Sequence, residues 1–478
     1  MKKKVSGSFC TLNGKSYYKI ENYDCMDNFF MTITSSSDVW NFCWSKGGIT
    51  AGRIDSNHAV FPYHTADKVS DATSYTGNFT SIAVKGSNTV WEPFSALRAA
   101  PSVQVASNTY LFRNLYKNLN GTEILFEEIN TKLQLKFITG WTSSEKYGLV
   151  RYSRIENLSD KEIECSVLDG CQNIMPACST SDFQNTKSVL LDAYKKTDLE
   201  ENTNLALFTL SSIVSDKAEP NEGLYANTCW FSTNDKVILA TDAPEQFAAL
   251  ASVNETSTGK DSKQKLPKYK DFVTTNCLKG QRPSCFICRN LKLKAAAESK
   301  DSAAEWYQVF DTALSTSAVV SLIKAITNKK AATKDLKNNI DLCDSQMTNF
   351  IQAADGIQHT GDEITCLHHR ENVMFNIMRG GIILDDGKID FADFILFAKQ
   401  RNKKLSDQLE KVLQNKVAGS NKAQNNKALS IPYSQLQALV EGTKNPQFLR
   451  LFLEYIPLTF SRRHGAPSRP WIIFSISI

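Results

Sequence analysis

The stretch KYGLVRYSRIENLSDKEIECSVLDG, residues 146–170, decides the fold class of this chain. Its first half alternates with a period of two, so that Leu149 and Ile155 fall on one face of a strand. Residues 157–160, Asn-Leu-Ser-Asp, have the composition of a turn, and Cys165 and Val167 then return on a single face. The pattern predicts a β-hairpin, in which two antiparallel strands are joined by this turn.

Similar runs fill the chain from its start to about residue 250. Leu133, Leu135 and Phe137 repeat the period of two just upstream, and short aromatic and β-branched runs are broken by Gly, Asn and Asp. Many such runs in series predict antiparallel sheets packed face to face, as in a large sandwich.

Helical spacing appears beyond residue 295. Trp306, Val309, Phe310, Ala313 and Leu314 fall at i, i+3, i+4, i+7 and i+8, which predicts one face of a helix. Further helices are predicted from similar spacings. These comprise a helix with Leu336, Ile340, Cys343, Met347 and Phe350 inward, a helix ending at Gly380, and a helix over residues 390–413.

Composition describes an ordinary globular protein. The 478 residues are 42% hydrophobic, and 55 basic against 50 acidic residues leave a net charge of +5. Such a small excess argues against a nucleic-acid partner. No apolar run approaches the roughly 20 residues of a membrane span, and no signal peptide is recognisable. Twelve scattered cysteines fit reduced thiols, so a cytoplasmic location is expected.

Two motifs suggest metal sites, but neither is complete. Cys277, Cys285 and Cys288 form a C-x7-C-x2-C cluster that lacks a fourth ligand nearby, so three buried strand residues are favoured over zinc. IILDDGKIDFADF, residues 382–394, matches the second half of an EF-hand loop, but Ile382 and Leu384 fall where oxygen ligands are needed. The sequence therefore predicts no metal and no cofactor.

No catalytic residue is predicted. Glu127 and Glu128 are neighbours on a predicted strand, so they point to opposite sides and cannot act together on one bond. An edge or a solvent-exposed face is the favoured position for them.

One dense polar cluster stands near the end of the chain, in SRRHGAPSRPW. Its guanidiniums and indole could hold a phosphate or stack on a sugar ring, or could form interdomain salt bridges instead. The candidate contact residues are Arg462, Arg463, His464, Arg469 and Trp471.

Several segments together resemble a known family. SKGGITAGRIDSNHAVFPYHTADKV (residues 45–69) and residues 119–177 resemble the N-terminal β-supersandwich of large bacterial carbohydrate-active proteins related to cellobiose phosphorylase. Residues 229–247, 371–381 and 459–471 look similar to later landmarks of the same group. In this family the sandwich is followed by a helical linker and an (α/α)6 barrel, which carries the general acid.

The resemblance implies an α+β chain with four parts. We expect a β-supersandwich over residues 1–295, a helical subdomain over 296–413, a flexible linker over 414–430, and short helices with the start of a missing catalytic domain over 431–478. Ala466 and Ile472 stand where the family pattern has Asp and Asn, which suggests a fragment or a frameshifted product.

Two functions follow from these observations. The first is the non-catalytic N-terminal portion of a glycoside phosphorylase- or hydrolase-like protein, with an oligo- or polysaccharide as partner, inorganic phosphate as a further candidate, and assembly into a homo-oligomer. The alternative is a stand-alone carbohydrate-binding or scaffold protein. Its sugar platforms would be Trp40, Trp44, Trp91 and Trp141, unless these rings pack in the core.

Overall fold

The computed structural model describes residues 3–87, 89–99, 109–213, 223–252, 266–297, 301–353, 357, 362–380, 388–417 and 430–462. The chain divides into two compact units, Met1–Asp344 and Ser345–Ile478. The described residues of the first unit form three antiparallel sheets, and those of the second are mainly helical. The α+β class predicted from the sequence is confirmed.

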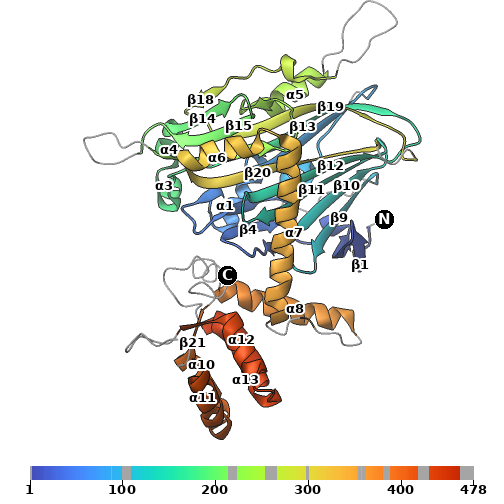
Figure 1. Cartoon of the computed structure of the whole chain (residues 1–478). Coiled ribbons are helices and arrows are strands. Elements are labelled where there is room, and N and C mark those ends of the chain that lie inside the picture. The colour runs from blue at the N-terminus through green and yellow to red at the C-terminus, as the bar shows by residue number, and fades with distance from the viewer. Residues whose placement is uncertain are drawn as a thin grey trace, which may run out of the picture. The chain divides into compact units, whose positions relative to one another are not determined.

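The largest sheet of the first unit has 11 strands in the order β1-β2-β9-β10-β11-β12-β20-β16-β15-β14-β18 (Figure 1). Its strands are β1 (Ser6–Leu12), β2 (Lys15–Glu21), β9 (Leu111–Asn118), β10 (Ile124–Asn130), β11 (Leu135–Ser144), β12 (Gly148–Asn157), β14 (Lys195–Glu200), β15 (Leu205–Leu210), β16 (Tyr225–Phe231), β18 (Cys277–Lys279) and β20 (Ala303–Ser315).

Two smaller sheets complete the β structure of this unit. A five-stranded sheet has the order β17-β19-β13-β7-β8, and a four-stranded sheet has the order β3-β4-β5-β6. Their strands are β17 (Val237–Ile238), β19 (Ser284–Leu293), β13 (Ile163–Gln172), β7 (Gly77–Val84), β8 (Val90–Trp91), β3 (Phe30–Ile33), β4 (Val39–Trp44), β5 (Ile49–Arg53) and β6 (Ala59–Phe61).

One hydrophobic core joins the three sheets. Phe137 on β11, Val167 on β13 and Phe61 on β6 are fully buried members of the same cluster. Apolar side chains from the inner faces of all three sheets therefore shield one another from water, which is the main stabilising term of such a sandwich.

Helices cover outer faces of the sheets. Leu336 on α7 packs with Val150 and Val309 of the eleven-stranded sheet, beneath α6 and α7 (Figure 1). Phe247 on α5 packs with Leu168 of the five-stranded sheet. The helices of this unit are α1 (Ala66–Asp71), α2 (Ser95–Ala99), α3 (Ser181–Thr186), α4 (Ser188–Tyr194), α5 (Ala243–Ser252), α6 (Thr316–Ile326) and the first part of α7 (Lys329–Ala353).

The predicted hairpin is wrong in its pairing, although both of its strands exist. β12 pairs with β11 and β20, whereas β13 pairs with β19 and β7 in the other sheet. The predicted turn instead connects two different sheets. Its conformation is stabilised by the Asn157 side-chain amide, which donates to the carbonyls of Lys161, Leu293 and Lys294. The predicted faces are correct, since Leu149, Ile155, Cys165 and Val167 all enter the shared core.

The helix predicted around Trp306 is also wrong. Residues 303–315 form β20, which pairs with β12 and β16 in the interior of the large sheet. Trp306 and Phe310 face the shared core, while Val309 packs with the helices on the other face. Because both faces are buried, apolar residues do not alternate with polar ones, and helical spacing arises by coincidence. Strand structure therefore continues past residue 295, as far as Ser315.

The second unit packs helices around a small core that includes Met347, Phe394, Leu409 and Phe452. The expected single helix over residues 390–413 is two helices, because Asn402 between them is extended. Its elements are the end of α7, α8 (Glu363–Gly380), α10 (Phe391–Arg401), α11 (Lys403–Val417), α12 (Tyr433–Glu441), α13 (Pro446–Arg462) and the strand pair β21 (Lys388–Asp390) and β22 (Ser430–Pro432). Across the described residues of the whole chain, no helix is long and apolar enough to cross a membrane.

Candidate functional site

The predicted polar cluster is almost wholly outside the described residues. This applies to Arg463, His464, Arg469 and Trp471. Arg462 is the last residue of α13, and the structure describes its backbone alone. A saccharide or anion site at these residues therefore stays a prediction.

The cysteine cluster does not come together. Cys277 is exposed on β18 in the eleven-stranded sheet, whereas Cys285 and Cys288 are buried on β19 in the five-stranded sheet. The expectation of buried strand residues is correct for the latter two and wrong for Cys277. In the part of the chain that the structure describes, no three His, Cys, Asp or Glu side chains are grouped to hold a metal ion.

The EF-hand-like segment is described only from residue 388 onwards. There the Asp390 carboxylate accepts hydrogen bonds from the backbone N–H groups of Ala392 and Asp393, so that it caps α10. The Asp393 carboxylate accepts a hydrogen bond from the Tyr455 hydroxyl at 2.8 Å. These two carboxylates stabilise the helix and its packing.

Glu127 and Glu128 were expected at an edge or on a solvent face, and this expectation is wrong. Both are buried in β10, which lies between β9 and β11. The Glu128 carboxylate accepts from Arg113 Nε at 2.6 Å and from Trp91 Nε1 at 2.8 Å. Each glutamate uses its own face, so they do not form an acid–base pair. Trp91 is accordingly a core residue.

A second buried ion pair joins the two larger sheets. Arg151 on β12 and Asp169 on β13 are both fully buried, with Nη2 and Oδ1 2.6 Å apart. Asp169 also accepts from Trp306 Nε1 at 2.7 Å and from the hydroxyls of Thr80 and Ser153. A buried carboxylate that accepts this many hydrogen bonds has a structural role, because its hydrogen-bonding capacity is used within the core.

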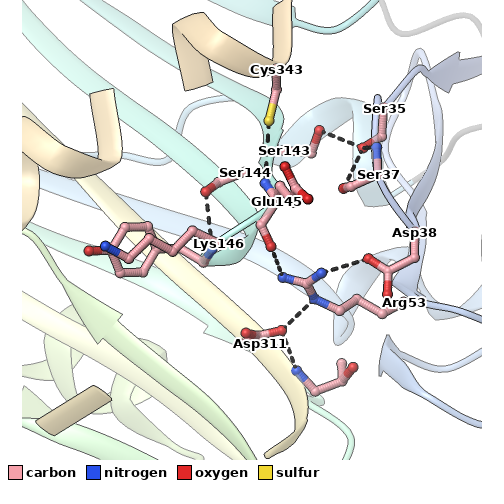
Figure 2. A network of polar contacts seen from close by, with 12 residues as sticks. Ser35, Ser37, Asp38, Arg53, Ser143, Ser144, Glu145, Lys146, Asp311 and Cys343 are labelled. Atoms are coloured by element: carbon pink, nitrogen blue, oxygen red, sulfur yellow. Dashed lines mark hydrogen bonds and ion pairs between the residues drawn. The ribbon is translucent and has the colours of Figure 1, made fainter. Parts of the chain in front are cut away.

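Arg53 forms the third such network, at the end of β5 (Figure 2). Its Nε donates to Asp311 Oδ1, its Nη1 to Asp38 Oδ1 and its Nη2 to the Glu145 carbonyl, each at 2.6 Å. Cys343 on α7 accepts a hydrogen bond from the Glu145 N–H at 3.3 Å. Burial raises the pKa of Asp311 against the opposing effect of Arg53. The network clamps the four-stranded sheet to the eleven-stranded one.

The four-stranded sheet has an aromatic outer face. We define this aromatic face as Phe30, Trp40, Phe42, Trp44 and Tyr63. The rings contact one another in sequence: Tyr63 lies edge-on to Trp40 at 5.9 Å, Trp40 contacts Phe42 at 6.1 Å, and Phe30 stacks on Phe42 at 5.5 Å and meets Trp44 edge-on at 5.2 Å. Because successive strand residues alternate, Trp40, Phe42 and Trp44 share one side of β4, while Cys43 enters the core.

The accessible part of this face is at Phe30 and Trp44. Phe30 is 47% exposed and Trp44 is half-buried, whereas Trp40 and Phe42 are buried. The Trp40 indole donates to the Asp55 carbonyl at 3.2 Å. Within the described residues the Trp44 indole N–H has no hydrogen-bond partner, so it remains a donor for a ligand. Thr32, half-buried two residues from Phe30 on β3, adds a hydroxyl on the same side.

Sequence reasoning found this face only in part. It singled out Trp40 and Trp44, and it missed Phe30, Phe42 and Tyr63. The spacing of Trp40, Phe42 and Trp44 at i, i+2 and i+4 is the signal that identifies a shared strand face. Trp141 is 3% exposed and packs in the shared core, so it offers no platform.

Comparisons with known proteins give no family assignment. No protein-family model matches the chain, and no curated protein matches its sequence. Among solved structures, a bacterial glucoamylase complexed with acarbose is similar at 10% sequence identity and a TM-score of 0.36. The match covers 99% of this chain and 61% of that chain, so this chain spans less than two thirds of its length. A likeness this weak carries no argument about this chain.

Proposed function

We propose that this chain is a carbohydrate-binding β-sandwich, the non-catalytic N-terminal portion of a glycoside phosphorylase- or hydrolase-like protein. The observation that carries the proposal is the aromatic face, where the exposed Phe30 ring meets Trp44 with its free indole N–H. Sugar rings present C–H groups to aromatic faces and hydroxyls to nearby donors, so a ring pair with one N–H donor suits them. The sequence resemblance described above supports the same class of ligand.

The non-catalytic role is supported by the hydrogen bonds that three buried carboxylates accept. Glu128, Asp169 and Asp311 each accept hydrogen bonds from an arginine. Glycosidic cleavage needs a protonated carboxyl and a second carboxylate facing one bond. Acids that link sheets in this way have a structural role and are not available as a catalytic pair. We therefore propose that residues outside this chain cleave the glycosidic bond.

The test is saccharide binding by the full chain, measured calorimetrically with soluble α-linked and β-linked gluco-oligosaccharides. We expect Phe30→Ala and Trp44→Ala each to weaken binding about tenfold, which corresponds to about 1.4 kcal/mol. Trp44→Phe keeps a ring but loses the N–H, so an intermediate loss identifies the hydrogen bond. Phe112→Ala, at a ring that is 38% exposed on β9, is the matched control and should bind as the wild type does.

The proposal fails if no member of the panel binds, or if binding is unchanged in both Phe30→Ala and Trp44→Ala. Binding that survives these changes would place the sugar elsewhere on the chain.

A further inference from the structure

A small cavity lies behind the turn that joins β4 to β5. Its volume is about 40 Å³, and its walls include Trp44, Lys46, Gly47, Phe94 and Arg98. A water molecule needs at least about 10–15 Å³ of such space, so the cavity has room for about three waters. A pyranose ring does not fit, but one small inorganic ion does.

Two cationic side chains line this cavity, and neither has an ion-pair partner among the described residues. Lys46 is only 2% exposed, and no acid of the described residues forms an ion pair with its ammonium. Arg98 donates to the Asn78 carbonyl and lies 5.4 Å over the Phe79 ring, again with no described acid in ion-pair distance. Burial lowers the pKa of Arg98 to about 10, so the guanidinium stays charged at neutral pH.

The neighbouring acids are engaged elsewhere. Asp24 and Glu128 both bind Arg113, at 3.0 and 2.6 Å. Glu92 is the acid that raises the pKa of Arg98 most, but it makes no ion pair with it. Burying a cation without a counter-charge is costly, and this cost falls when an anion enters the site. The pair of cations therefore favours a negatively charged occupant.

The turn packs against the Arg98 side chain. Gly47 has a φ of +107°, and a Cβ there would lie 2.8 Å from Arg98 Cγ. The backbone N–H of Lys46 donates to Asn28 Oδ1, and that of Gly47 donates to the Trp44 carbonyl. Since these N–H groups are occupied, the ligands for an anion come from the Lys46 and Arg98 side chains.

We propose that this cavity binds one tetrahedral oxyanion, inorganic phosphate or sulfate, between Lys46 and Arg98. A tetrahedral oxyanion matches the cavity in size, and its oxygens accept charge-assisted hydrogen bonds from an ammonium and a guanidinium at once. The cavity shares Trp44 with the aromatic face, but the proposed anion ligands are Lys46 and Arg98, so the proposal stands whether or not the aromatic face binds sugar.

The experiment uses the full chain, dialysed free of anions other than chloride. Phosphate and sulfate are titrated by calorimetry at constant ionic strength, with chloride as the reference, so that general screening is held fixed. We expect Lys46→Met and Arg98→Met to weaken binding at least tenfold, and Lys46→Arg to retain most of it. Lys161→Met, at an exposed lysine, should bind as the wild type does. The phosphate and sulfate titrations show which of the two anions is preferred.

If a variant does not fold, hydrogen exchange measured on the wild-type chain tests the same proposal. Phosphate should slow exchange in peptides spanning residues 44–48 and 94–98 and leave the rest unchanged. The proposal is overturned if neither anion binds better than chloride, if Lys46→Met and Arg98→Met fold and bind normally, or if protection appears elsewhere. Phe30→Ala should leave phosphate binding intact, which separates this result from the test of the proposed function.

Discussion

Arg151→Met offers the sharpest test of the account of the core. The substitution keeps most of the side-chain volume but leaves Asp169, which is fully buried, without its counter-charge. Removal of one partner from a buried pair costs about 3–5 kcal/mol, since the remaining charge is desolvated without compensation. Trp306, Thr80 and Ser153 still donate to Asp169 and offset part of this loss. We therefore expect a loss of about 3 kcal/mol in the free energy of unfolding.

The assay is urea unfolding at pH 7 followed by tryptophan fluorescence. Trp471 is the only tryptophan beyond residue 344, so the signal reports mainly on the first unit. Adding Asp169→Asn to Arg151→Met removes the uncompensated negative charge. The double variant should therefore lose about 1–3 kcal/mol less in the free energy of unfolding than the sum of the two single losses. Lys292→Met, at an exposed ion pair with Glu164, is the control and should change stability by no more than about 0.5 kcal/mol.

Two results would refute this reasoning. A loss of less than about 1 kcal/mol in Arg151→Met would mean that the pair does not hold the sheets together. Strictly additive losses in the double variant would mean that the two residues act independently.

Three further predictions concern single side chains. Burial lowers the pKa of Lys329 to about 8, so between about pH 8 and 10.5 this lysine binds more protons in the unfolded chain than in the folded one. The stability of the wild type to urea, measured relative to Lys329→Met, should therefore rise by about 1–3 kcal/mol across this window, and a constant difference would contradict the burial of this ammonium. A Cβ at Gly52 would lie 2.7 Å from the Trp40 ring, so Gly52→Ala should weaken both stability and saccharide binding. Gly86→Ala, with open space around it, is the control and should leave binding unchanged in the same calorimetric assay. Cys277 is exposed, so mass spectrometry after brief maleimide treatment should find it modified before the buried thiols, and equal modification of all thiols would contradict the described fold.

Local patterns predicted strands more reliably than they predicted strand partners. Alternation correctly placed Leu149 and Ile155 of β12 on one face, but it contains no information about which strand lies alongside. The partners of β13 are β19 and β7, both far from it along the chain, and the choice depends on how the sheets pack. Around Trp306 even the element type was wrong, because a strand buried on both faces loses its alternation.

The residues of the candidate sites also differ in whether the sequence reveals them. Trp40 and Trp44 could be singled out because their types and spacing are visible in the sequence. Lys46 and Arg98 could not, because they are far apart in sequence and come to line one cavity only in the folded chain. Phe30 joins the aromatic face through the pairing of β3 with β4, which the sequence pattern did not reveal.

The most direct measurement of the central claim is hydroxyl-radical footprinting of the full chain with and without a saturating gluco-oligosaccharide. If the aromatic face is the saccharide site, oxidation of Phe30 and Trp44 should fall on adding the sugar, while Phe112, exposed on a different sheet, should be oxidised equally in both samples. Unchanged oxidation of Phe30 and Trp44 in the presence of bound sugar would contradict the proposed function.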